Sequence, residues 1–150
     1  MAYLKVNNVR IVGVSAAVPT KVKDIVNQPC FAGGAEEAKK VIAVTHVERS
    51  RMVEDGQCCS DLCYEAADKL LIELGWNRDE VEALIFVSLS RDYNTPATAG
   101  LLQDRLGLTK ECYAIDVPLA CSGYVYGLSV VSSLVSTGGI REALLLVGET

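Results

Sequence analysis

The sequence predicts an α/β fold in which a mostly parallel, mixed sheet is covered by helices. Two segments, 83–89 and 143–147, are apolar at nearly every position, which is typical of strands buried on both faces. Helical periodicity at 60–74 and 122–137 alternates with these strands, as in proteins built from βαβ units. Half of the 150 residues are hydrophobic and 22% are charged, so the chain has enough apolar side chains for the core of one domain.

The charge pattern argues against nucleic acid and membrane partners. The formal net charge is −5, with no long run of basic residues, whereas phosphate contacts need clustered lysines and arginines. The longest apolar runs are much shorter than the roughly 20 residues that span a bilayer. The first residues also lack the basic and then apolar pattern of a signal peptide. We therefore expect a cytoplasmic protein.

The six cysteines do not have the spacing of a metal site. Cys58, Cys59 and Cys63 are clustered, but no second pair of cysteines or histidines stands at ligand spacing, and His46 is the only histidine. Disulfides are rare in the cytoplasm. We expect no metal, no cofactor and no disulfide, and we expect the three clustered cysteines to pack in the interior.

The first third of the chain predicts one strand and one clear helix. Residues 3–14 first alternate and then run apolar, which predicts a first, central strand followed by a turn at 15–19. Asp24 is placed to start a helix that the stretch 30–34 interrupts. Residues 36–44 have helical spacing, and three apolar side chains are expected to face inward: Ala38, Val41 and Ile42.

The segment from Ser60 to Leu74 predicts the longest helix of the first hundred residues. Ser60 is a suitable N-cap, and Gly75 is placed to end the helix. Asp61 and Glu65 favour the positive end of the helix dipole. The expected buried face consists of Leu62, Ala66, Leu70 and Leu74, with Cys63, Ala67 and Leu71 beside them. The spacing of 77–80 predicts a single further turn.

The loop at 90–95 follows the carboxyl end of the strand at 83–89, and open α/β sheets place their sites at such ends. Thr95 and Pro96 then predict a helix start, with threonine as the cap and proline at the first position. Gly107 is placed to end that helix.

The last forty residues predict a right-handed βαβ unit. Tyr113–Val117 reads as a short strand, Ser122–Thr137 as a helix, and Ala143–Val147 as a second strand. Gly123 and Gly127, four residues apart, favour close packing of this helix on the sheet.

Cys121 therefore lies where a strand turns into a helix. The first N–H groups of a helix have no internal partners, and the dipole is positive there, so both favour a thiolate. The same N–H groups are able to stabilise the oxygen of a thioester as it becomes negative. The position predicts a nucleophile. The alternative is a cysteine that merely packs, as most free cysteines do.

The motif Asp-Val-x-x-Ala-Cys-x-Gly at 116–123, followed by the helix and by Ala-Leu-Leu-Leu-Val-Gly-Glu, resembles the nucleophile segment of the β-ketoacyl-acyl carrier protein synthase III family of the thiolase superfamily. Residues 11–19 and 95–107 are also similar to that family. The resemblance implies a thiolase-like half, in which the helix that starts at Cys121 is central and buried. It also implies that Cys121 is the acyl-accepting nucleophile and that its backbone N–H contributes to the oxyanion site.

The resemblance implies two further, weaker sites. In the family the residue at the position of Thr95 reaches across a two-fold axis and helps to close the partner's acyl pocket. The family carries Thr-Gly-Ile followed by arginines where this chain has Thr45 and then His46 in place of glycine. Arg49 and Arg51 are accordingly candidates for coenzyme A or carrier-protein contacts. The alternatives are a plain helix cap for Thr95 and surface ion pairs for the two arginines.

The implied reaction is a decarboxylative condensation in fatty acid biosynthesis. Cys121 takes an acyl group from acyl-CoA, and the acyl-enzyme condenses with malonyl-acyl carrier protein in a homodimer. The family's catalytic histidine and asparagine lie in a second half, so we expect residues 1–150 to be one N-terminal domain that is inactive alone and self-associates. Alternatives are a related condensing enzyme of secondary metabolism, a hydroxymethylglutaryl-CoA synthase-like enzyme, or a non-catalytic scaffold that binds acyl carriers.

Overall fold

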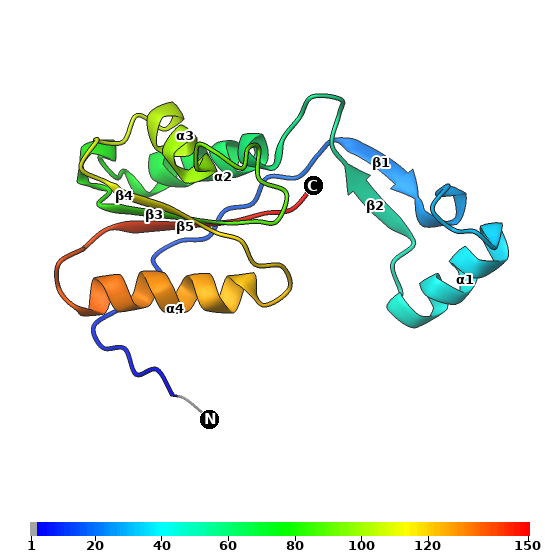
Figure 1. Cartoon of the computed structure of the whole chain (residues 1–150), viewed down its shortest axis with the longest axis horizontal. Helices are drawn as coiled ribbons and strands as arrows, with labels where there is room; N and C mark the ends of the chain where they lie inside the picture. Colours follow the sequence, from blue (N-terminus) through cyan, green and yellow to red (C-terminus); the bar gives the residue numbers. More distant parts are fainter. Residues whose placement is uncertain (1–2) are drawn as a thin grey trace. The chain divides into compact units, whose positions relative to one another are not determined.

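The computed structural model describes residues 3–150, which fall into two units. Residues 18–57 form one of them, called here the small unit. Residues 3–17 and 58–150 form the other, called the large unit (Figure 1). The assignment of the whole chain to a single domain stays a prediction.

The large unit is built on a parallel sheet of three strands, in the order β4-β3-β5. The strands are β3 (Ala83–Val87), β4 (Tyr113–Val117) and β5 (Ala143–Val147). Ile85 in the middle of β3 lies opposite Ile115 on one side and Leu145 on the other. The predicted parallel α/β architecture is confirmed, and β4 and β5 have the bounds that the sequence predicts.

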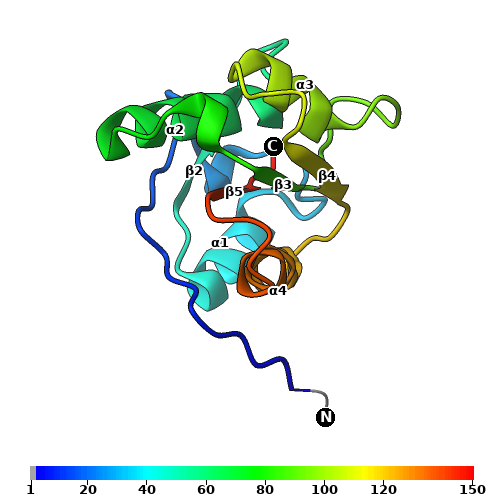
Figure 2. The ribbon, with the colours of Figure 1, turned by 90° about the vertical axis from the view of Figure 1, so that its left-hand side faces the viewer.

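Helices cover both faces of this sheet. Figure 2 shows α2 (Cys59–Leu74) and α3 (Thr98–Arg105) on one face and α4 (Gly123–Ser136) on the other. All five residues of β3 are buried, as expected for a central strand with helices on both sides. Phe86 packs with the α2 and α3 side chains, and Val87 packs with Val131 of α4.

The two crossover connections have the same hand. The chain passes from β3 through α3 to β4 on one face, and from β4 through α4 to β5, past β3, on the other. Both the direction of travel and the covered face are reversed between the two, so the hand is kept, as expected for parallel sheets.

Helix α2 begins one residue before the predicted cap. Its N-cap is Cys58, because the Asp61 carboxylate accepts a hydrogen bond from the Cys58 N–H at 2.8 Å. Ser60, the predicted cap, is buried inside the helix. Gly75 ends the helix with φ +65°, as predicted. The buried residues of the helix are Cys59, Ser60, Cys63, Ala67 and Leu71, so the predicted burial of Cys63, Ala67 and Leu71 is confirmed but the centre of the buried face is rotated. The predicted Leu62, Ala66, Leu70 and Leu74 are only half-buried.

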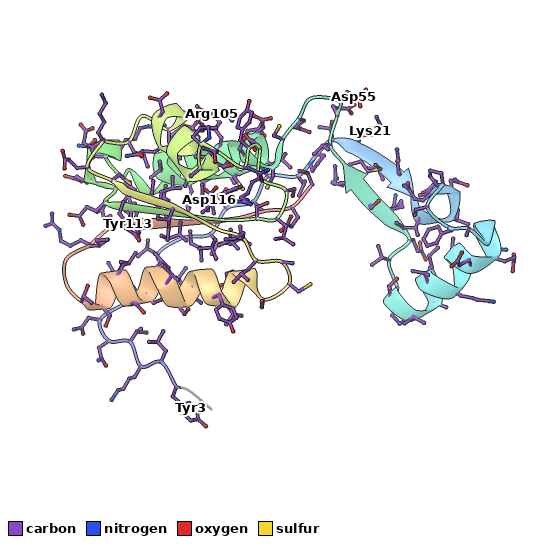
Figure 3. All side chains as sticks on the ribbon, viewed as in Figure 1. Tyr3, Lys21, Asp55, Arg105, Tyr113 and Asp116 are labelled. Atoms are coloured by element: carbon purple, nitrogen blue, oxygen red, sulfur yellow. The ribbon has the colours of Figure 1, made fainter. Side chains whose placement is uncertain are left out.

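Helix α3 starts at Thr98, later than the predicted start at Pro96. A carboxylate from a neighbouring strand caps it: Asp116 of β4 accepts hydrogen bonds from the N–H groups of Thr98 at 2.9 Å and Ala99 at 2.7 Å (Figure 3). This anchor fixes the first turn at Thr98 and leaves Thr95 in the preceding loop, so the prediction of Thr95 as the cap is wrong. Gly107 follows the helix with φ +67°, as expected.

The strand predicted at residues 3–14 does not form. The Asn7 N–H donates to Ser136 Oγ of α4 at 3.1 Å, and Gly13 packs against Leu70 of α2. The segment therefore passes the edge of the sheet from one helical layer to the other, as Figure 2 also shows, and within the described residues it has no strand partner. Its alternating side chains stay outside the core, with Ile11 63% and Val14 83% exposed.

The small unit consists of a two-stranded antiparallel sheet and one helix. Strand β1 (Lys21–Asp24) pairs with β2 (Arg49–Met52), and a 3-10 turn η1 (Ile25–Asn27) and helix α1 (Gly34–Thr45) lie between them in the chain. The predicted helix at 36–44 is confirmed. Ala38 faces inward as expected, whereas Val41 is 38% exposed and Ile42 is half-buried. Both strands were missed by the sequence analysis.

His46 ends α1 in the left-handed region, with φ +57°, and its N–H donates to the Ile42 carbonyl at 2.7 Å. Glycine is favoured in this conformation, which gives a physical reason for the glycine of the resembled family at this position.

The predicted turn after α2 is the 3-10 turn η2 (Arg78–Glu80), capped by the Asn77 side chain. None of the helices in the described chain is long and apolar enough to cross a bilayer.

Candidate active site

Cys121 follows the carboxyl end of β4 and directly precedes Ser122, the N-cap of α4. The thiol-bearing residue is exposed. The turn between them is closed by the Gly123 N–H, which donates to the Ala120 carbonyl at 2.7 Å, and helix α4 begins at Gly123. A free cysteine is more often buried, so exposure at this position favours a chemical role over packing.

Two glycines hold the start of α4 against the sheet. A Cβ at Gly123 would lie 2.5 Å from Val87 Cγ1, and a Cβ at Gly127 would lie 2.7 Å from Val87 Cγ2 and 2.8 Å from Leu145 Cδ1. Side chains there would push the helix away from the strands. The helix start, and with it the turn that carries Cys121, therefore lies over the carboxyl end of β3.

The segment 88–97, called here the β3–α3 loop, leaves this same end of β3. Its base is bound to the end of β5 by Glu149. One carboxylate oxygen of Glu149 accepts from the Leu89 N–H at 2.9 Å, and the other accepts from the Ser90 N–H at 3.1 Å and from Ser90 Oγ at 2.7 Å. Burial raises the pKa of Glu149, but these hydrogen bonds from Ser90 and Leu89 outweigh it and lower the pKa overall.

The middle of the β3–α3 loop is bound to α2. Ser60 Oγ donates to Asp92 Oδ2 at 2.5 Å, and Arg105 donates to the same Ser60 oxygen at 3.2 Å. Arg105 also pairs with Asp61 at 2.9 Å and lies over the Tyr64 ring, with 4.8 Å between its guanidinium carbon and the ring centroid. The loop is thus tied to β5 at its base and to α2 in its middle.

Thr95 lies in the β3–α3 loop and is exposed. The peptide bond between Thr95 and Pro96 is cis. Cys121 and Thr95 thus follow the carboxyl ends of two adjacent strands, β4 and β3, and open α/β sheets place their sites at such ends. The contact of Thr95 with a partner's acyl pocket stays a prediction.

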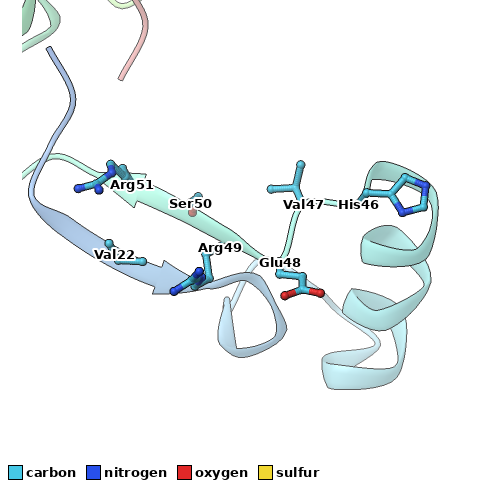
Figure 4. A pocket seen from close by; sticks show the side chains of 7 residues that line it. All are labelled: Val22, His46, Val47, Glu48, Arg49, Ser50 and Arg51. Atoms are coloured by element: carbon cyan, nitrogen blue, oxygen red, sulfur yellow. The ribbon is translucent and has the colours of Figure 1, made fainter. Parts of the chain in front are cut away.

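Arg49 and Arg51 lie on one face of β2 in the small unit, and both are exposed. They line an open pocket of about 520 Å³ (Figure 4), whose other lining residues are Val22, His46, Val47, Glu48 and Ser50. Arg51 donates to the Pro19 carbonyl at 2.8 Å, so it already helps to hold the turn before β1. Arg49 forms no ion pair or side-chain hydrogen bond within the described residues. Arg49 is therefore the better candidate for an anionic ligand.

The clustered cysteines pack in the core beneath the site. Cys59 and Cys63 are buried, and a Cβ at Gly148 would lie 2.8 and 2.9 Å from their sulfurs. A hydrogen bond from Cys63 lowers the pKa of Cys59, against the effect of burial. Burial, followed by the charge of Asp92, raises the pKa of Cys58. The expected packing role of Cys59 and Cys63 is confirmed, and all six cysteines of the chain are free.

Sequence reasoning missed Glu149 and the capping role of Asp116. Asp116 lies near the carboxyl end of β4 and Glu149 follows that of β5, and this position is the signal by which the sequence could have indicated them. Neither residue belongs to a recognisable acid–base motif, because their partners are backbone N–H groups that a pattern of side chains does not reveal.

Comparison with known proteins gives a consistent result. The family model described as 3-Oxoacyl-[acyl-carrier-protein (ACP)] synthase III matches residues 115–150, the region of β4, Cys121, α4 and β5. The chain is 34% identical over 138 residues to the beta-ketoacyl-[acyl-carrier-protein] synthase III of Rhodopirellula baltica, covering 92% of this chain and 39% of that protein.

Solved structures agree with the sequence comparison. The crystal structure of a 3-oxoacyl-(acyl-carrier protein) synthase from Burkholderia xenovorans superposes with a TM-score of 0.79 at 36% identity, over 88% of this chain and 38% of that one. A 3-oxoacyl-(acyl carrier protein) synthase III from Xanthomonas oryzae pv. oryzae gives 0.85 at 27% identity, over 97% and 44%.

These matches, together with an exposed cysteine between a strand end and a helix start, define a thiolase-like α/β fold. The chain belongs to the β-ketoacyl-acyl carrier protein synthase III family. It spans about two fifths of the length of the relatives that it matches, 39% in the case of the Rhodopirellula protein.

Proposed function

We propose that the chain is the nucleophile-bearing part of a 3-oxoacyl-[acyl-carrier-protein] synthase III. The observation that carries this proposal is the exposed Cys121 at the start of α4, inside the region that the family model matches. The proposal places the protein in fatty acid biosynthesis in the cytoplasm, as a homodimer, with acyl-CoA and malonyl-acyl carrier protein as substrates.

In the proposed reaction the Cys121 thiolate attacks the carbonyl carbon of acyl-CoA. The backbone N–H of Cys121 donates to the oxygen as it becomes negative, and coenzyme A leaves as its thiol when the tetrahedral intermediate collapses. The acyl-cysteine then reacts with the enolate that forms when malonyl-acyl carrier protein loses carbon dioxide. The bond between the acyl carbon and Cys121 breaks in this second step, and the product leaves on the carrier protein.

Further residues of the chain have a proposed part in this chemistry or its geometry. Gly123 and Gly127 carry no side chains, so the start of α4 and the turn at Cys121 lie close to the sheet. Thr95, a small polar residue on the adjacent β3–α3 loop, is the proposed contact to a partner's acyl chain. Arg49 is the proposed contact to an anionic group of coenzyme A or of the carrier protein, and Arg51 adds charge to the same pocket.

Acyl transfer to the chain tests the proposal. The chain is incubated with acetyl-CoA, and the acyl group is located by peptide mass spectrometry. We expect one hydroxylamine-labile acyl group on Cys121, its loss in Cys121→Ser and its retention in Cys30→Ser, because Cys30 is the chain's other exposed cysteine. Equal acylation of the two cysteines, or none on Cys121, would contradict the proposal.

The chain alone is proposed to form no condensation product, because the family's histidine and asparagine have no counterparts in it. Incubation with acyl-CoA and malonyl-acyl carrier protein is expected to yield no β-ketoacyl carrier protein above a Cys121→Ser blank. Turnover by the 150-residue chain would show that the chemistry needs no further residues.

A further inference from the structure

The β3–α3 loop is held by three carboxylates from three different segments. Glu149 after β5 binds the base of the loop, Asp92 within it binds α2 through Ser60, and Asp116 of β4 caps the helix that the loop enters. Loops that connect strands to helices are usually more mobile than the elements they connect. The density of anchors points to a loop whose position matters.

Among the three, Glu149 makes the largest number of bonds to the loop. Its two oxygens accept from two backbone N–H groups and the Ser90 hydroxyl, and Ser88 Oγ is 3.5 Å away. The N–H of Thr150 donates to Ser90 Oγ at 2.9 Å, so a second residue after β5 also binds the loop at Ser90. Hydrogen bonds to an ionised carboxylate are about twice as strong as neutral ones.

The bonds reach the part of the loop that leads to Thr95. Leu89 and Ser90 are the first exposed or half-exposed residues after β3, and their N–H groups no longer belong to the sheet ladder. Without Glu149 these N–H groups would donate hydrogen bonds to water instead, and the loop would be fixed only from Asp92 onward. The position of Thr95 relative to the strand ends is therefore set from both sides.

We propose that Glu149 is a positioning residue, which sets the base of the β3–α3 loop and thereby the place of Thr95 at the carboxyl edge of the sheet. The inference rests on the proposed function for the meaning of Thr95, since that residue is the proposed acyl-chain contact. Glu149 does not touch the reacting atoms; it acts on the shape of the acyl site through Leu89 and Ser90.

Backbone amide exchange in Glu149→Gln tests the inference. Glutamine has the same shape but offers one accepting oxygen, and its NH₂ group faces an N–H donor. A residue that merely fills space would be replaced by glutamine without effect. We expect exchange at Leu89 or Ser90 to rise about tenfold or more, while Ile85 in the core of β3 keeps its protection. Glu65→Gln, at an exposed glutamate of α2, is the matched control and is expected to change neither.

The heteronuclear NOE of the Thr95 amide provides the second measurement. We expect it to fall in Glu149→Gln, and to fall by less in Ser90→Ala, which removes only the hydroxyl and keeps the hydrogen bonds that the Leu89 and Ser90 N–H groups donate to Glu149. Unchanged exchange at Leu89 and Ser90, an unchanged Thr95 amide, or a uniform rise that includes Ile85 would each overturn the inference. Acylation of Cys121 is measured separately, so failure of the loop inference and failure of the proposed function give different results.

Discussion

At the scale of single residues, exposure distinguishes Cys121, close to a helix start, from the cysteines that pack in the core. Cys121 is exposed, whereas Cys59 and Cys63 are buried under Gly148. The sequence placed Cys121 correctly because its position depends on local signals, a short strand followed by small residues and an apolar helix. It did not reveal Glu149, whose partners are N–H groups about sixty residues away along the chain.

Glu149 gives a prediction for the pH dependence of stability. Its pKa is lower in the folded chain than in the unfolded one, where the pKa of a glutamate is about 4.3. The carboxylate therefore stabilises the fold fully above the unfolded pKa, and this contribution is lost as the pH falls through the folded pKa. We expect the difference in unfolding free energy between the wild type and Glu149→Gln to be constant from pH 7 to 5.5 and to shrink below pH 4.5.

Urea unfolding of the two chains at several pH values measures this difference. Comparison of the pair cancels the other carboxylates, which titrate in both. A difference that grows toward low pH, or one that does not depend on pH at all, would show that the Glu149 carboxylate is not stabilised in the folded chain.

At the scale of elements, a cap from a distant strand decides where α3 begins. Asp116 is 18 residues from Thr98 along the chain, so no local pattern predicts that the helix starts there. Similarly, residues 3–14 alternate between apolar and polar side chains as a strand does. A strand forms only with a hydrogen-bonded partner, and the side-chain pattern does not indicate whether such a partner exists. The strands β4 and β5 were predicted with their observed bounds because burial on both faces leaves a strong apolar signal.

Asp116→Ala is expected to destabilise the chain by about 0.5–2 kcal/mol, since two N–H groups at the start of α3 lose their acceptor. Asp104→Ala, at an exposed position in the last turn of the same helix, is the control and is expected to cost less than ~0.5 kcal/mol. Chemical denaturation measures both. Equal effects of the two substitutions would mean that Asp116 does not act as the cap.

The contact of α4 with the sheet gives a second prediction at this scale. Alanine at Gly127 would meet Val87 and Leu145 at less than 3 Å, and overpacking of this kind costs about 1–3 kcal/mol. Gly100 of α3 is the matched helical glycine, because a Cβ there meets nothing within 4 Å. Gly100→Ala should stabilise by about 1 kcal/mol through helix propensity alone.

Thermal unfolding of the two variants compares them directly. We expect a lower melting temperature for Gly127→Ala and a higher one for Gly100→Ala. A stabilising effect of both substitutions would mean that α4 does not lie as close to β3 and β5 as the structure places it.

At the scale of the whole molecule, the chain exposes an apolar surface on α4. The exposed fractions of Tyr124, Val125 and Tyr126 are 52%, 66% and 58%. All three lie in the first turn of α4, close to Cys121 in the chain. Large exposed apolar patches in soluble proteins mark surfaces that bind another protein segment or associate with themselves. The sequence predicted the apolar character of this helix, but only the structure shows which of its side chains remain uncovered.

We expect the chain to self-associate through this face. Sedimentation velocity at increasing concentration should show a rising average mass for the wild type, and Val125→Glu should shift the rise to higher concentration by about tenfold or more, because a charge in an apolar contact is costly. Val44→Glu is the control, since Val44 is also exposed but lies on α1 of the small unit. The same shift for both variants would argue against α4 as the contact.

The proposed role of Cys121 as nucleophile is tested by the rate at which iodoacetamide alkylates Cys121 relative to Cys30 in the folded chain near neutral pH. Both residues are exposed, but Cys121 directly precedes Ser122, the N-cap of the long helix α4, whose first N–H groups have no partners within the helix. A helix dipole stabilises a negative charge near the N-terminus by about 0.3–1 kcal/mol, so we expect Cys121 to react about twofold to fivefold faster than Cys30 and this advantage to disappear in urea. Equal rates in the folded chain, or a faster reaction at Cys30, would contradict it.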